Sequence, residues 1–323
     1  MKLWLKALLS LALLALLLWQ VDIRQIGVTL AATRLELSGA AFVLFLFQQV
    51  LVAYAWHMLL PAGGNRVPFF RTVEVHAIGS FFGTFLPSSV SMDVVRAYRL
   101  GRYLEHGVAS ASAMFVTRVV GFLVNFVLAL IVAIPVSYHG RNAGIFGMVL
   151  ALTVVFVASV FLILHHRALA FIKGILTRFG LAGIAEKIGG FRAGIVALGR
   201  SRSRMLPLLA VSFVYQSLGI VIVFMLGRAL GLELSLWRYF IYLPVITALT
   251  VLPISLAGIG IREGAFVFFF AQAGVMQAQA LALSLLLFAQ TLALALLGGL
   301  WYFLVRETSA PERASVTEKA LWP

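Results

Sequence analysis

Two short polar stretches interrupt an otherwise apolar sequence, and both contain residues that suit anion binding. They span residues 86–96 and 252–262, and each begins with Leu-Pro-x-Ser and has an arginine nine residues after the proline. The two prolines lie 166 residues apart, as do the two arginines. Matched polar breaks in corresponding places of an apolar chain are typical of a transporter binding site.

The residue types at the breaks point to a phosphate group. Proline ends a helix because it lacks an N–H and crowds the preceding turn. Ser91 or Asp93 is expected to cap the helix after the first break, and Gly258 and Gly260 give the second break backbone freedom. Each following helix should then present free N–H groups and an arginine to the anion. The candidate substrate-binding residues are Pro87, Ser88, Ser89, Ser91, Asp93, Arg96, Arg118, Pro253, Ser255, Gly258, Gly260, Arg262 and Glu263.

The charged residues have a second interpretation, as structural ion pairs that hold the breaks in shape. Asp93 would pair with Arg96, and Glu263 with Arg262. Ionisable groups at membrane depth are costly and mostly functional, which favours a binding role for the two arginines. Both interpretations stay open for the two acids. Arg118 either supplies a third cation or extends its side chain to the membrane interface.

Composition assigns the chain to the all-α polytopic membrane proteins. Of 323 residues, 62% are hydrophobic and 11% charged, and apolar runs of about 20 residues, long enough to cross a bilayer, recur. The net charge of +14 lies in loops, which indicates membrane topology and anionic lipid head groups rather than nucleic acid. The absence of cysteine excludes disulfides and thiolate metal sites.

We expect about six full spans and two re-entrant pairs of short helices. The first span is interpreted as a retained membrane segment, because no small-residue cleavage site follows it. A short loop to Ser38 is expected after it. The full spans are placed at about residues 3–19, 39–60, 109–136, 143–164, 205–230 and 279–305, and the short apolar segments at 72–86, 240–252 and 261–273.

Residues 165–204 carry eight Lys or Arg and one acid, with apolar residues at helical spacing, which predicts two amphipathic helices on the membrane surface. The positive-inside rule places the basic segments and both termini on the cytoplasmic side of a bacterial or archaeal cytoplasmic membrane if the breaks are re-entrant. If each short pair spans instead, one basic segment lies outside. The re-entrant arrangement gives an inverted repeat. Its units are residues 1–142, with a break near 86–96, and 143–305, with a break near 252–263, before a polar tail at 306–323.

No catalytic motif accompanies these features. The sequence has no G-x-x-x-x-G-K-[ST], H-E-x-x-H or G-x-S-x-G, and its loops are too short for a soluble catalytic domain. We therefore expect a protein that is not an enzyme, with no cofactor and no metal. Glu74 and His76 are expected at the interface rather than in a proton relay. An enzyme acting on a lipid phosphate stays an alternative, with Asp93 and the nearby serines as its candidate residues.

In the order and spacing of these motifs, the sequence resembles the flippase-like membrane region of lysylphosphatidylglycerol synthases, a family that includes stand-alone proteins of about this length. The resemblance covers the chain up to its tail. The family usually has a glycine pair before the acid of the first break, where this chain has Ser91 and Met92, so a head group should approach this backbone differently. The matching residues are Phe85 to Ser89, Asp93, Arg96, Arg118, Gly121, Pro253 to Ser255, and Gly258 to Gly264.

The resemblance implies translocation of a lipid or lipid-linked precursor, with an anionic phosphate head group held between the two broken helices. The expected partners are membrane lipids, anionic or phosphate-bearing. No synthase domain lies within this sequence, so the synthase activity is not expected. The alternative is a scaffold that binds the enzymes of a lipid or glycolipid synthesis complex through its basic surface. In that case charge reversal on the surface, and not mutation of the breaks, would abolish function.

Overall fold

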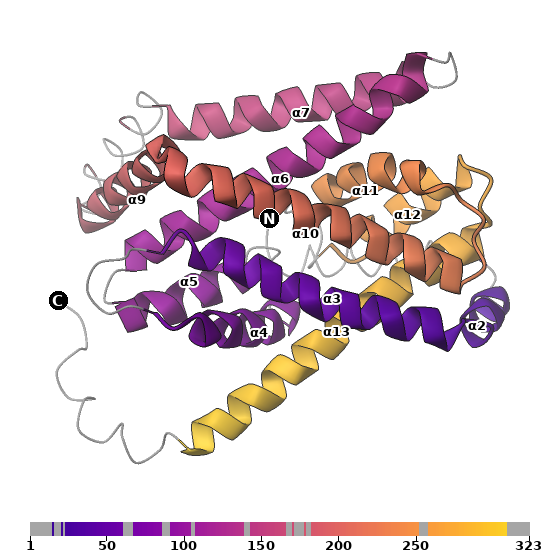
Figure 1. Cartoon of the computed structure of the whole chain (residues 1–323), viewed down its shortest axis with the longest axis horizontal. Coiled ribbons are helices and arrows are strands. Elements are labelled where there is room, and N and C mark those ends of the chain that lie inside the picture. Colours follow the sequence, from indigo (N-terminus) through magenta and orange to yellow (C-terminus); the bar gives the residue numbers. More distant parts are fainter. Residues whose placement is uncertain are drawn as a thin grey trace.

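The computed structural model describes residues 15, 21, 23–60, 67–85, 91–104, 107–138, 143–165, 170, 178, 182–251 and 258–308. Within these ranges all regular structure is α-helical, as the sequence predicts (Figure 1). The helices are α2 (Ile23–Ala31), α3 (Leu35–His57), α4 (Phe69–Phe85), α5 (Ser91–Leu104), α6 (Gly107–Tyr138), α7 (Ala143–Leu164), α9 (Ala182–Arg200), α10 (Arg202–Ala229), α11 (Leu236–Val251), α12 (Ile261–Ala271) and α13 (Gln277–Thr308).

Four of the described helices, α3, α6, α10 and α13, are long and apolar enough to cross a membrane. The apolar part of α7 (Phe146–Leu162) and the whole of α11 are shorter. Bulky apolar side chains are exposed on these helices, for example Phe161 on α7 and Phe303 on α13. Exposed apolar surface of this kind suits contact with lipid chains, so the chain is a multi-pass membrane protein. The first predicted span, residues 3–19, lies outside the described residues except for Ala15.

Helix α2 corrects the prediction of a loop before Ser38. Ile26 is buried, and Leu30, one helical turn later, packs against the core. The two side chains share the face with which α2 packs on α13. Burial of this apolar face explains why the segment is helical although Arg24 and Asp22 make its sequence polar.

The second predicted surface helix is α9, which packs against α6. Its Lys187 and Arg200 are exposed. The first predicted surface helix falls mostly on residues that the structure does not describe. The membrane-surface position of both helices stays a prediction.

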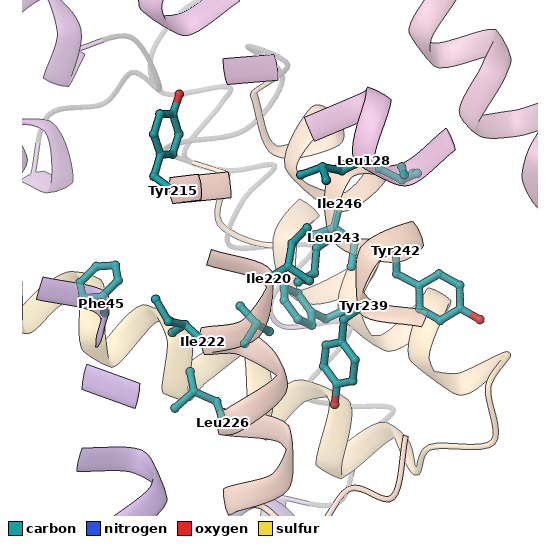
Figure 2. Close-up of a cluster of buried hydrophobic side chains, with 14 of the residues drawn as sticks. Phe45, Leu128, Tyr215, Ile220, Ile222, Leu226, Tyr239, Tyr242, Leu243 and Ile246 are labelled. Atoms are coloured by element: carbon teal, nitrogen blue, oxygen red, sulfur yellow. The ribbon is translucent and has the colours of Figure 1, made fainter. Parts of the chain in front are cut away.

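Helices α3 and α10 form an antiparallel pair at the centre of the bundle (Figure 1). The Arg34 N–H, at the start of α3, donates to the Ala229 carbonyl at the end of α10 over 2.9 Å. Further along the pair, Gln48 Nε2 donates to the Tyr215 carbonyl over 2.9 Å. Both contacts fit helices that run in opposite directions. Figure 2 shows the buried cluster around this pair, to which α3, α6, α10 and α11 contribute side chains.

Helix α4 packs on α13, and α11 packs on α6. Helices α4 and α13 approach closely at Gly298, where a β-carbon would meet the Ala77 carbonyl. The two polar breaks join α4 to α5 and α11 to α12 in the sequence, and each extends into the start of the following helix, at Ser91 of α5 and Ile261 of α12. At each break, the short helix before it packs on a long helix of the other half of the chain. The short helix after the break packs on the short helix before it.

Candidate functional site

Helix α5 begins at Ser91, within the first break. Pro87, Ser88 and Ser89 lie outside the described residues, and the Ser91 side chain is not described either. The remaining predicted residues of this break, Asp93 and Arg96, lie one turn apart on α5 and face the interior.

Arg96 is buried, with 5% of its surface exposed, and it joins α5 to α4. Its Nη2 donates to Ser80 Oγ over 2.8 Å and to the His76 carbonyl over 3.2 Å, and its Nε donates to the same carbonyl over 3.3 Å. Its aliphatic stem lies against Gly79, where a β-carbon would meet Arg96 Cγ. The glycine therefore makes room for the arginine, whose described donors bond mainly to α4.

Asp93 lies between two arginines. Its Oδ1 is 3.7 Å from Arg96 Nη1, and its Oδ2 forms an ion pair with Arg118 of α6. The structure thus brings together three residues that the sequence analysis singled out. Arg118 pairs with Asp93 beside the first break, and its role as a third cation for an anion or as a side chain extending to the membrane interface stays a prediction. The side chain of Arg118 remains 29% exposed.

His76 extends this network to α3, and sequence reasoning missed its position. It is 3% exposed, and its Nε2 lies 3.0 Å from Gln49 Oε1 and 3.3 Å from Arg96 Nη2. His76 is buried in the bundle, and the prediction that Glu74 and His76 lie at the depth of the membrane interface stays a prediction. Glu74 is also buried, with 9% of its surface exposed, and pairs with Arg71 over 2.7 Å. Both are on α4, whose packing between α3, α5 and α13 explains their burial.

The second break has a different arrangement around Arg262 and Glu263. Pro253 and Ser255 lie outside the described residues. Gly258 and Gly260 have φ angles of +80° and +84°, a backbone conformation that favours glycine, as the sequence predicts. Glu263 Oε2 accepts a hydrogen bond from the Gly260 N–H over 2.7 Å and so caps α12.

This cap changes the expected chemistry of the second break. An incoming anion was expected to meet free N–H groups at the start of α12, but Glu263 already binds the Gly260 N–H. Glu263 is 2% exposed, and its Oε1 accepts a hydrogen bond from Arg262 Nε over 2.9 Å. The Arg262 guanidinium also lies 4.8 Å from the centre of the Phe288 ring. Glu263 thus takes one N–H at the start of α12 from an incoming anion, and the Arg262 guanidinium is the charged group that can meet it.

Arg262 lines a cavity of about 260 Å³ between the two halves of the chain. The apolar part of its wall includes Phe45, Leu243 and Ile246, which Figure 2 shows within the buried cluster. The polar part combines three carboxamides, two hydroxyl groups and one guanidinium. These side chains are Gln48 of α3, Asn125 of α6, Gln216 of α10, Thr247 and Thr250 of α11, and Arg262 of α12.

Five of these six polar residues were not predicted from the sequence. Gln48 (next to Gln49), Asn125 and Gln216 are amides inside long apolar spans, which is the signal that would have found them. Asn125 lies two turns after Arg118 on α6, so the cavity is about 10 Å further along this helix than the Asp93–Arg118 pair. Among the described residues no group of three or more His, Asp or Glu side chains suits a metal ion.

The sequence matches the family model of the lysylphosphatidylglycerol synthase transmembrane region over residues 3–299. The chain belongs to this family. Comparison with curated proteins and with solved structures gives no match. The matched region contains both breaks, Arg118 and every residue that lines the cavity. Membership of the lysylphosphatidylglycerol synthase transmembrane family connects this chain with membrane lipids.

Proposed function

We propose that this protein moves a phosphate-bearing lipid, or a lipid-linked precursor, between the two leaflets of a bacterial or archaeal cytoplasmic membrane. The observation that carries the proposal is the polar cavity inside an apolar bundle, with Arg262 in its wall. A guanidinium is suited to binding a phosphate. A head group in such a cavity exchanges water for protein partners while its acyl chains stay in lipid. The movement needs no covalent chemistry, so the proposal describes a transporter and not an enzyme.

The helix order and packing support an inverted repeat, which is part of the proposal because it would give alternating access to this cavity. Shifted by 166 residues, the bounds of α3, α4 and α6 fall close to those of α10, α11 and α13. The contacts follow the same correspondence. Helix α4 packs on α13, and its counterpart α11 packs on α6, the counterpart of α13. The counterparts α3 and α10 run antiparallel, as their contacts Arg34–Ala229 and Gln48–Tyr215 require. Two halves of opposite orientation around one site are a common transporter plan.

The two equivalent arginines have different roles in this proposal. Arg262 faces the cavity and binds the phosphate. Arg96, bonded to α4, is a positioning residue that holds the re-entrant pair α4–α5 together and keeps Asp93 next to Arg118. The re-entrant course of both breaks, and cytoplasmic positions for both chain ends, are part of the proposal. They rest on the basic residues around the breaks and on α9.

Proteoliposomes with a fluorescent phospholipid test the proposal. Leaflet exchange is followed by adding a membrane-impermeant quencher, with and without an imposed pH gradient. We expect exchange with the wild-type chain and with Arg228→Gln, which removes an exposed arginine at the end of α10. Arg262→Gln should exchange lipid much more slowly at equal reconstitution. No exchange by the wild-type chain under either condition, with any phosphate-bearing lipid tested, would refute the proposal.

A further inference from the structure

The hydrogen-bonding groups of the cavity restrict which head group it can hold. A phosphodiester carries no hydrogen-bond donor at neutral pH, so it needs donors from the protein. A cavity built for phosphate alone would therefore present donors only. The cavity around Arg262 instead presents acceptors as well.

Three acceptors follow from the contacts of the lining side chains. Gln48 Nε2 donates to the Tyr215 carbonyl over 2.9 Å, and Gln216 Nε2 donates to the Gly121 carbonyl over 2.6 Å. Each of these bonds uses one of the two amide hydrogens, so each amide keeps one N–H to donate and its Oε1 to accept, and no described residue donates to either oxygen. Thr250 uses its one hydroxyl hydrogen on the Thr247 carbonyl over 2.8 Å, so its Oγ1 can offer a ligand only lone pairs.

Asn125 adds both kinds of group. It is 5% exposed, lines the cavity, and forms no side-chain hydrogen bond with any residue that the structure describes. The Asn125 amide is open to the cavity, so a ligand with a donor and an acceptor can hydrogen-bond to both of its polar atoms. The cavity therefore offers one cation, three amides that can each donate and accept, and the Thr250 hydroxyl oxygen as a further acceptor.

A hydroxyl group satisfies this set because it both donates and accepts. An ammonium group also donates, but it needs a carboxylate nearby. The acid next to the cavity, Glu263, is 2% exposed and already bonds to Arg262 and to the Gly260 N–H. The volume of about 260 Å³ is just below the roughly 300–1,000 Å³ of pockets for drug-sized ligands, so it suits one head group without the acyl chains.

We propose that the cavity selects lipids whose singly charged phosphodiester head group carries hydroxyl groups, such as glycerol or a sugar. The phosphate lies at Arg262, and the hydroxyl groups donate to Gln48, Gln216 and Thr250 and exchange hydrogen bonds with Asn125. This inference rests on the proposed function, because it names the substrate class of the same site.

The test compares three acyl-labelled lipids in proteoliposomes of the full chain. Phosphatidylglycerol and phosphatidylpropanol have the same charge and the same three-carbon head group, but only the first carries hydroxyl groups. Phosphatidylethanolamine carries an ammonium group instead. We expect phosphatidylglycerol to exchange at least tenfold faster than either of the others, because a site that hydrogen-bonds a hydroxyl group rejects an analogue that lacks it.

Two variants connect the preference with the cavity. Asn125→Leu should bring the rates for phosphatidylglycerol and phosphatidylpropanol close together. Thr250→Val, which keeps the shape of the side chain, should lower their ratio by about two- to tenfold, the effect of one hydrogen bond. The matched control is Gln290→Leu, which removes a carboxamide that is 5% exposed and does not line the cavity. It should keep the wild-type ratio.

The outcomes separate this inference from the proposed function. Equal exchange of all three lipids would overturn the inference and leave lipid movement standing, whereas no exchange of any lipid would refute the proposed function. Preference for phosphatidylethanolamine would also overturn the inference. A soluble source of the same chemistry is tested with glycerophosphoglycerol, a phosphodiester without acyl chains. Its binding to the purified chain, without movement of any lipid, would assign the cavity to a soluble polyol phosphate.

Discussion

Replacing Arg96 by leucine tests whether this arginine positions the helices or binds the substrate. The side chain is 5% exposed and donates three hydrogen bonds to α4 at 2.8–3.3 Å, and its ion pair with Asp93 measures 3.7 Å. Removing one member of a buried charged pair typically costs about 3–5 kcal/mol of unfolding free energy. The cost should lie near the lower end, because the groups that Arg96 leaves behind keep other partners.

Those partners are visible in the structure. Ser80 Oγ still donates to the His76 carbonyl over 2.9 Å, and Asp93 keeps its ion pair with Arg118. The leucine side chain fills part of the space over Gly79 that the arginine stem occupies. We therefore expect Arg96→Leu to lower the free energy of unfolding by about 3 kcal/mol.

Unfolding by SDS titration in mixed micelles measures this change, with Arg228→Leu as the control for loss of an exposed arginine. The control should change stability by less than about 0.5 kcal/mol. Reconstituted, folded Arg96→Leu protein should keep the lipid preference of the wild-type chain. Unchanged stability together with lost lipid movement would refute this reasoning, because Arg96 would then be a substrate ligand.

Three further predictions follow from the second break and the helix contacts. Glu263→Gln keeps an acceptor for the α12 cap but removes the charge that pairs with Arg262. More anionic lipid should therefore co-purify with this variant than with the wild-type chain, and an unchanged amount of lipid would contradict the prediction. Gly260→Ala should lower the free energy of unfolding by about 1–3 kcal/mol and slow lipid movement, because the φ angle of Gly260 is +84°. Gly274 has the same φ angle in a turn away from the cavity, so Gly274→Ala should lower stability without slowing lipid movement. Gly298→Ala should destabilise the chain by about 1–3 kcal/mol in the same titration, because its β-carbon meets the Ala77 carbonyl, while Gly144→Ala, with no atom within 4 Å, should not.

Hydrophobicity and breaks were enough to predict most of the helices. The fourth predicted span coincides with α7, and the other described spans differ from α3, α6, α10 and α13 by a few residues at their ends. Apolar runs fix such elements because a bilayer accepts only segments with internally satisfied backbones. Helix α2 was missed because its stability comes from packing on α13, which local composition does not show.

The candidate site was predicted in part. The sequence pointed to Asp93, Arg96 and Arg118, and the structure joins them. The sequence could not tell whether Arg96 or Arg262 would face a cavity. That difference depends on Gly79 and His76, which hold Arg96 against α4. The amides that line the cavity come from three helices far apart in the chain, so only their packing brings them together.

The most direct test of the central claim is identification of the lipids that accompany the protein. The chain is extracted with its native bilayer, and its lipids are compared by mass spectrometry for the wild type, Arg262→Gln and Arg228→Gln. We predict that one phosphate-bearing lipid is enriched with the wild type and with Arg228→Gln and is lost from Arg262→Gln. The same bulk lipids with all three proteins would contradict a head-group site at Arg262.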